Sequence, residues 1–172
     1  MNYSSIKYFD TADGSGIRTA LYVSGCRIHC KGCHNFEAWD FNSGKPFTDI
    51  ELNEIIESLK PDYISGLSIL GGEPTEPENA IELAKIISKI KEELPKKNIW
   101  VYSGRIIEAL DNLANEDSEY GRAIKFILSK ADILIDGPFL EEQRDITLKF
   151  RGSSNQRIID LKSRKELNPE KV

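Results

Sequence analysis

The sequence has few cysteines, no long apolar run and no excess of positive charge. Its 172 residues include only three cysteines, and an odd, clustered set argues against a disulfide framework. We therefore expect a reducing, cytoplasmic environment. No apolar run approaches the ~20 residues of a membrane span, and because the first residues lack an apolar region we expect no secretory signal. The formal net charge of −5 gives no electrostatic reason to expect nucleic-acid binding.

The composition that is present belongs to an ordinary globular protein. Hydrophobic residues make up 40% of the chain and charged residues 30%. A chain of this length most simply forms one domain. We expect residues 1–161 to form that domain and the charged residues 162–172 to form a polar C-terminal tail.

Strand and helix patterns alternate along the chain. β-Branched and aromatic runs predict strands at residues 17–23, 65–70, 98–102, 131–135 and 157–161. Apolar residues at helical spacing predict helices that begin after Thr48, at Pro77, and within 106–113 and 120–129. This alternation implies right-handed βαβ units and a mainly parallel sheet. Because a closed eight-stranded barrel needs about 250 residues, we expect a single-domain α/β fold, either an incomplete βα barrel or an open sheet.

The unusual sequences each directly follow a predicted strand. They are the cysteine segment 24–35, Gly-Gly-Glu-Pro at 71–74, Tyr-Ser-Gly at 102–104 and Asp-Gly-Pro at 136–138. In a parallel sheet these positions lie together at the carboxyl edge, where α/β proteins bind ligands. The sequence therefore predicts four loops that converge on one site.

All three cysteines fall within eight positions, as Cys26, Cys30 and Cys33. Three thiolates from one short loop suit a metal centre, because each sulfur is a soft anionic ligand. A structural zinc site needs a fourth ligand, which here would be His29 or His34, and His34 adjoins Cys33 too closely for unstrained ligation by both. A 4Fe–4S cluster normally takes four cysteines, so three would leave one iron open to an external ligand. The spacing favours iron–sulfur and leaves zinc as the alternative.

Residues 71–74 have a structural and a functional interpretation. A glycine pair before proline often just turns a strand into a helix. The glycines would also let backbone groups approach a ligand closely, and Glu73 would accept from an ammonium group. The stretches at 102–104 and 136–139 are, individually, only turn signals.

Together these motifs resemble the radical S-adenosylmethionine superfamily. C-x-x-x-C-x-x-C after one strand and G-G-E-P after the next carry that resemblance. Residues 10–19 and 33–35 resemble signatures of the activating enzymes of glycyl-radical proteins. Residues 26–35, 102–105, 132–139 and 151–157 are similar to the small activators of anaerobic ribonucleoside-triphosphate reductase. The resemblance spans about residues 6–161, with one departure: Gly32 stands where many members carry an aromatic residue.

The resemblance implies one 4Fe–4S cluster with Cys26, Cys30 and Cys33 as ligands, and S-adenosylmethionine chelating the fourth iron. The contacts that it implies for S-adenosylmethionine are Gly71, Gly72 and Glu73 for the methionine amino group, the backbone around Gly32, Cys33, His34 and Asn35 for the adenosyl part, and Ser103. It implies no acid–base residue, because the cofactor carries the chemistry.

The implied activity is that of an oxidoreductase that cleaves S-adenosylmethionine reductively to a 5′-deoxyadenosyl radical. That radical would generate a glycyl radical on anaerobic ribonucleoside-triphosphate reductase, the implied protein substrate. The resemblance also implies an external one-electron donor. It implies neither a nucleic acid nor a membrane as a partner. Alternatives are activation of another glycyl-radical enzyme, a radical reaction on a small heterocycle, and a zinc-stapled α/β binding module without catalysis.

Overall fold

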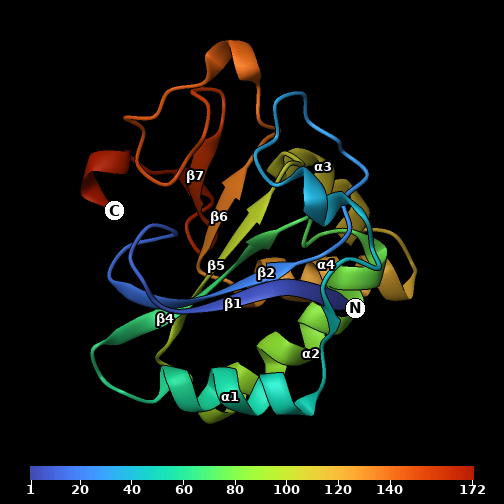
Figure 1. Ribbon diagram of the computed structural model, residues 1–172, viewed down its shortest axis with the longest axis vertical. Helices are drawn as coiled ribbons and strands as arrows, with labels where there is room; N and C mark the ends of the chain where they lie inside the picture. Colours follow the sequence, from blue (N-terminus) through green and yellow to red (C-terminus); the bar gives the residue numbers. More distant parts are fainter.

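One eight-stranded sheet organises the structure, a computed structural model that describes residues 1–172 apart from the side chain of Lys171 (Figure 1). The strand order is β3-β1-β2-β4-β5-β6-β7-β8. The strands are β1 (Asn2–Asp10), β2 (Ile17–Val23), β3 (Lys45–Pro46), β4 (Ile64–Gly71), β5 (Asn98–Ser103), β6 (Ile133–Asp136), β7 (Arg157–Asp160) and β8 (Lys165–Glu166). The five predicted strands are all present, while β1, β3 and β8 were not predicted.

The prediction of a mainly parallel sheet is wrong for its two flanks. Strands β2, β4, β5 and β6 pair in parallel, whereas β3, β1, β7 and β8 join antiparallel, so the sheet is mixed. The chain passes from β1 to β2 through residues 11–16 and from β7 to β8 through 161–164. Neither connection has the dozen or more residues that a parallel crossover requires. The strand order is open, running from β3 at one edge to β8 at the other.

The four predicted helices form close to their expected limits. They are α1 (Asp49–Leu59), α2 (Pro77–Glu93), α3 (Ile107–Ala114) and α4 (Glu119–Lys130). The capping box of α1 is present: the Thr48 side chain accepts from Ile50 N at 3.2 Å, and Glu51 accepts from Thr48 N at 2.8 Å. None of the described helices is both long enough and apolar enough to span a membrane.

Successive side chains along a strand pack on opposite faces of the sheet. Ile99 and Val101 of β5 belong to the main core, which packs against all four helices. Trp100 belongs to a smaller cluster on the opposite face with Ile133 and Ile135, and Tyr102 packs against that cluster. The helices therefore cover one face of the sheet, and the other face is left to loops and to the C-terminal residues.

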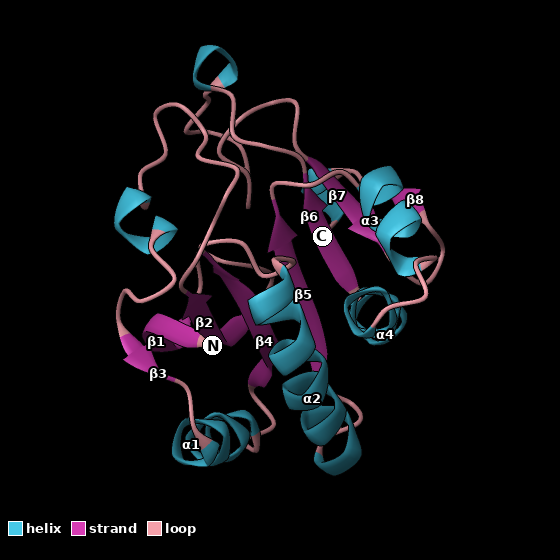
Figure 2. Cartoon of the chain, turned by 90° about the vertical axis from the view of Figure 1, so that its right-hand side faces the viewer, coloured by secondary structure: helices cyan, strands magenta, loops and turns pink.

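The long loops gather beyond the carboxyl ends of the central strands. In Figure 1 the cysteine loop (light blue) and the loop between β6 and β7 (orange) lie at the same end of the sheet, and Figure 2 shows the same gathering from the side. Short 3-10 helices occur there at η1 (Phe36–Trp39) and η2 (Glu141–Gln143). Residues 162–172, expected as a polar tail, contain β8 and a third 3-10 helix, η3 (Pro169–Lys171).

Candidate functional site

A pocket of about 170 Å³ lies where the central strands end. Its lining draws on all four predicted loops: the three cysteines, His34 and Asn35 from the first, Gly71, Gly72 and Glu73 from the second, Ser103 and Gly104 from the third, and Gly137 from the fourth. The structure thus brings the four loops together, as the parallel alignment of β2, β4, β5 and β6 predicts. Gly32 instead lines a neighbouring, larger pocket.

The cysteine loop is fastened to the rest of the site through its backbone. Cys26 N donates to Trp39 O at 3.1 Å, and Glu73 N donates to Gly25 O at 2.8 Å. His29 has a left-handed φ of 51° and stacks its ring on Trp39, with ring centroids 4.3 Å apart. Trp39 therefore packs against His29 and also borders the pocket.

The thiols face the pocket from a partly desolvated loop. Cys26 is buried, and Cys30 and Cys33 are half-buried. Burial raises the pKa of the Cys26 and Cys30 thiols. Within the described residues, no three His, Cys, Asp or Glu side chains are grouped so as to hold a single metal ion. Three sulfur donors that line one pocket fit an iron–sulfur cluster with one iron left for an external ligand.

The glycine pair brings the second loop close to the first. Gly71 has a φ of +111°, and a Cβ there would lie 2.6 Å from Val23 O. A Cβ on Gly72 would lie 2.5 Å from Gly25 O. The glycines therefore permit a close approach between the second loop and the chain at the end of β2. The close approach of this backbone to a ligand stays a prediction.

Glu73 holds the third loop with its carboxylate. The residue is 1% exposed. Its Oε1 accepts from Thr75 N at 2.8 Å and from the Ser103 hydroxyl at 2.9 Å, and its Oε2 accepts from Gly104 N at 2.7 Å. An interaction between Glu73 and an ammonium group stays a prediction, because the carboxylate already has these protein donors.

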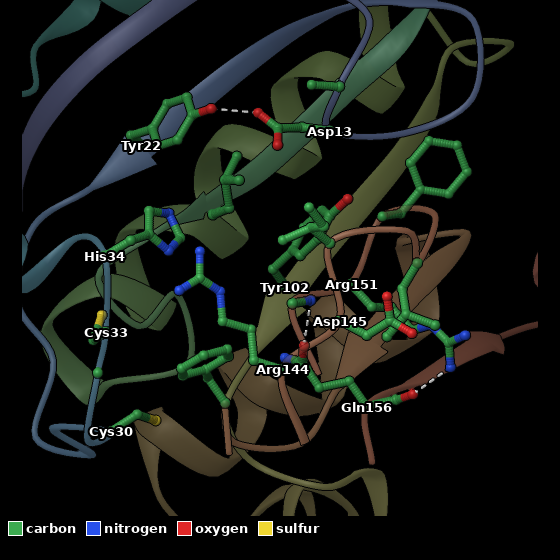
Figure 3. Close-up of a pocket in the computed structure, with 18 residues that line it drawn as sticks. Asp13, Tyr22, Cys30, Cys33, His34, Tyr102, Arg144, Asp145, Arg151 and Gln156 are labelled. Atoms are coloured by element: carbon green, nitrogen blue, oxygen red, sulfur yellow. Dashed lines mark hydrogen bonds between the residues drawn. The ribbon is translucent and has the colours of Figure 1, made fainter. Parts of the chain in front are cut away.

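A larger pocket, of about 550 Å³, adjoins the first. The two share side chains from both the cysteine loop and the helix-free face of the sheet: Tyr22, Cys30, Cys33, His34, Leu70, Tyr102, Phe139 and Gln156. Figure 3 shows Cys30 and Cys33 on one side of this pocket and Asp145 and Arg151 on the other. Its far wall is therefore the loop between β6 and β7.

Two tyrosines, Tyr22 and Tyr102, line both pockets. The sequence motifs include Tyr102 only as part of a turn signal and Tyr22 only as part of a predicted strand. The Tyr22 hydroxyl donates to the Asp13 carboxylate and accepts from Lys7 Nζ at 3.0 Å. Burial raises the pKa of Tyr22, and its hydrogen bond to Asp13 adds to the increase. The available signal was positional, because both tyrosines lie near the ends of parallel strands, β2 and β5, that flank β4.

Comparison with known proteins gives the class first. A family described as "4Fe-4S single cluster domain" matches residues 12–159, which include all three cysteines and all four loops. The fold and the site thus define a protein that carries one 4Fe–4S cluster, and the zinc alternative is not supported.

The relatives give the particular family. A protein of Haemophilus influenzae named anaerobic ribonucleoside-triphosphate reductase-activating protein is 39% identical over 92% of this chain and 97% of its own. A protein of the same name from Escherichia coli K12 is 35% identical over 94% of this chain and 100% of its own. Another, from phage T4, is 34% identical over 92% of this chain and 93% of its own. The chain belongs to the family of anaerobic ribonucleoside-triphosphate reductase-activating proteins.

Proposed function

We propose that this protein cleaves S-adenosylmethionine reductively and generates a glycyl radical on anaerobic ribonucleoside-triphosphate reductase. The observation that carries the proposal is the single pocket into which three thiols and the Gly-Gly-Glu loop converge. The relatives named as activators of that reductase match nearly the whole chain, so they support both the chemistry and the target.

Cys26, Cys30 and Cys33 would hold three irons of the cluster. A 4Fe–4S cluster held there would supply one electron for cleavage of S-adenosylmethionine to methionine and a 5′-deoxyadenosyl radical, the species that would take a hydrogen atom from the glycine α-carbon. The protein's own contribution is ligation, orientation and exclusion of water. The burial that raises the thiol pKa values also provides a partly dry site.

The proposed contacts to S-adenosylmethionine follow the pocket lining. Backbone groups of Gly71 and Gly72, together with Glu73, would receive the methionine amino group, and Ser103 would lie nearby. The backbone of Cys33, His34 and Asn35 would lie against the adenosyl part. Gly32 would contact it from the side of the larger pocket.

The larger pocket offers lateral access for a polypeptide. Its lining includes Tyr22, Leu70 and Tyr102 of the helix-free face. We infer that the four parallel strands, with helices on one face and both pockets on the other, form the partial βα barrel that the resemblance implies. A barrel left open at one side would admit a glycine-bearing loop.

Further elements of the proposal rest on sequence alone. Clustered free cysteines suit a reducing cytoplasm, and the electron would come from an external one-electron donor. The net charge of −5 does not favour a nucleic-acid partner.

The proposal is tested by anaerobic reconstitution with iron and sulfide. We expect a brown protein whose paramagnetic signal, after reduction, changes when S-adenosylmethionine is added. Mixing with the reductase should then give a glycyl radical, and a reductase in which the glycine is replaced by alanine is the control. A colourless protein that retains one zinc would refute the chemistry. Formation of 5′-deoxyadenosine without a radical on the reductase would refute the target alone.

A further inference from the structure

Two buried carboxylates and one arginine form a cluster at the smaller pocket, and of the three Glu73 belongs to the pocket lining. Glu73 and Glu76, both on the loop between β4 and α2, are each 1% exposed. Arg105, just past the end of β5, reaches both: its Nη2 donates to Glu76 Oε1 at 3.1 Å, and its Nη1 lies 3.8 Å from Glu73 Oε1. Its Nη1 also donates to the Thr75 hydroxyl at 3.0 Å. One guanidinium therefore contacts three side chains of a neighbouring loop.

Glu76 extends this network to the cysteine loop. It accepts from Arg27 N at 3.0 Å and from Arg27 Nη1 at 2.9 Å. Because Arg27 directly follows Cys26, the bond to its amide fixes the backbone on one side of that cysteine. On the other side, Asn79 Nδ2 donates to Ser24 O at 3.0 Å. The start of α2 and the turn before it thus hold Cys26 from both flanks.

Arg105 supplies the counter-charge for this arrangement. Among the described residues, it is the cation that makes ion pairs with both buried carboxylates. Arg27 pairs with Glu76 too, but its side chain is 54% exposed and is shared with Glu78. Burial lowers the pKa of Arg105, while the charges of Glu73 and Glu76 raise it, with a net increase, so Arg105 stays charged. Removing one partner from a buried ion pair leaves an uncompensated charge, which is strongly unfavourable.

The network joins three of the four loops. Arg27 belongs to the cysteine loop, Glu73, Thr75 and Glu76 to the second loop, and Arg105 to the third. Tyr120 of α4 closes it from outside by donating to Thr75 O at 2.7 Å. A change at Arg105 therefore acts on the position of the second and third loops together.

We propose that Arg105 is a positioning residue that holds the Gly-Gly-Glu loop and the Ser103–Gly104 turn in the arrangement that binds S-adenosylmethionine. This inference rests on the proposed function. Arg105 acts through Glu73 and Glu76, since its contacts are to those side chains and to Thr75. Glu76 is the second residue of this arrangement. It accepts hydrogen bonds from Arg105 and from the Arg27 amide, and so it links Arg105 to the backbone beside Cys26.

This role predicts that binding of the cosubstrate and binding of iron respond differently. Cys33 N donates to Cys30 O at 3.1 Å within the cysteine loop itself, so part of that loop keeps its shape without Arg105. The second and third loops, in contrast, lose their shared cation. Affinity for S-adenosylmethionine should therefore fall while iron is retained.

The test compares Arg105→Met, Arg105→Lys and the control Arg122→Met in reconstituted holoprotein. Arg122 pairs only with the exposed Asp117, at 3.2 Å, so its loss should change nothing. For Arg105→Met we expect the Kd for S-adenosylmethionine, followed by the change in the reduced cluster's paramagnetic spectrum, to rise by about ten- to a hundredfold. The KM for S-adenosylmethionine should rise more than kcat falls. Arg105→Lys, which keeps the charge, should recover most of the affinity.

Glu76→Gln gives a second measurement that does not depend on activity. We expect faster hydrogen exchange at the Arg27 amide in the apoprotein, because the amide loses a charged acceptor. The inference is overturned if Arg105→Met binds S-adenosylmethionine as the wild type does. If Arg105→Met does not fold, either of two other results overturns the inference. One is an Arg105→Lys variant that binds S-adenosylmethionine no better than an unfolded protein does. The other is an unchanged hydrogen-exchange rate at the Arg27 amide in Glu76→Gln. A wild-type protein that never cleaves S-adenosylmethionine would instead refute the proposed function.

Discussion

The Ser103 hydroxyl donates a hydrogen bond of 2.9 Å to Glu73 Oε1, and this bond joins the end of β5 to the loop after β4 beneath the candidate pocket. Ser103 also accepts from Arg105 N at 3.0 Å and lies 3.1 Å from the Thr75 hydroxyl. It is 4% exposed. The residue expected to contact the cosubstrate therefore also has a supporting role within the protein.

Replacement of Ser103 by alanine should lower stability. The change leaves the Arg105 amide without its acceptor and removes one donor from a buried carboxylate, so we expect a loss of about 1–3 kcal/mol in the free energy of unfolding. Urea denaturation of the apoprotein measures it. Ser129→Ala, which removes an exposed hydroxyl that donates to Phe126 O at 2.8 Å, is the control and should cost less. Equal stability of the two variants would contradict the supporting role.

Cys30→Ala should abolish formation of 5′-deoxyadenosine while leaving the protein folded. Cys30 is half-buried in a loop outside the main core, so its loss removes a proposed iron ligand and little packing. Iron content, cluster absorbance and product formation are the measurements, with thermal unfolding of the apoprotein as the check on folding. Lys31→Ala is the matched control, because Lys31 is its neighbour, has a side chain 90% exposed and pairs with Glu141. Full activity in Cys30→Ala would remove Cys30 as an essential ligand.

Gly71→Ala should be far more disruptive than Gly104→Ala. At Gly71 the backbone has a φ of +111° and the new Cβ would meet Val23 O at 2.6 Å and Val23 N at 2.7 Å, so backbone must move. At Gly104 the new Cβ would meet Ile28 Cδ1 at 2.6 Å, the end of a side chain that can rotate away. We expect Gly71→Ala to cost about 2 kcal/mol or more from backbone strain alone. The midpoints of urea denaturation of the two variants measure this difference in stability. Similar midpoints would argue against the close backbone contact at Gly71.

The strands and helices that could be predicted are those with strong local patterns. Strands β2, β4 and β5 are apolar runs closed by glycine-containing turns, and α1 carries its own capping box. Strand β1 was missed because its residues are mostly half-buried or exposed and show little apolar alternation. The antiparallel flanks were missed because β1, β3 and β8 were themselves missed, so the short connections that exclude a parallel crossover could not be recognised. The long segment between β6 and β7 permits either pairing direction.

The same limit applies to the site. The cysteines and the glycine pair could be found because they are unusual residues in unusual spacing. Glu76 and Arg105 could not, because charged residues in a loop after a strand are ordinarily solvated. Only the fold shows that Glu76 is 1% exposed and that three loops share its contacts. A charged residue in a loop can therefore be recognised as part of the site only once its burial is known.

The ion pair between Arg157 and Glu108 should make stability depend on pH below 4.5. Hydrogen bonds from Arg157 lower the pKa of Glu108 from 4.5 to about 2. A lowered pKa means that the pair contributes fully above pH 4.5 and that its contribution is lost as the pH falls towards 2. Since 60% of the Glu108 side chain is exposed, solvent screening leaves about 0.5–1 kcal/mol. Urea denaturation should show Glu108→Gln less stable than wild type at pH 6, with the difference shrinking as the pH approaches 2. The control Glu142→Gln should show no such trend, and a difference independent of pH would exclude the pair as its cause.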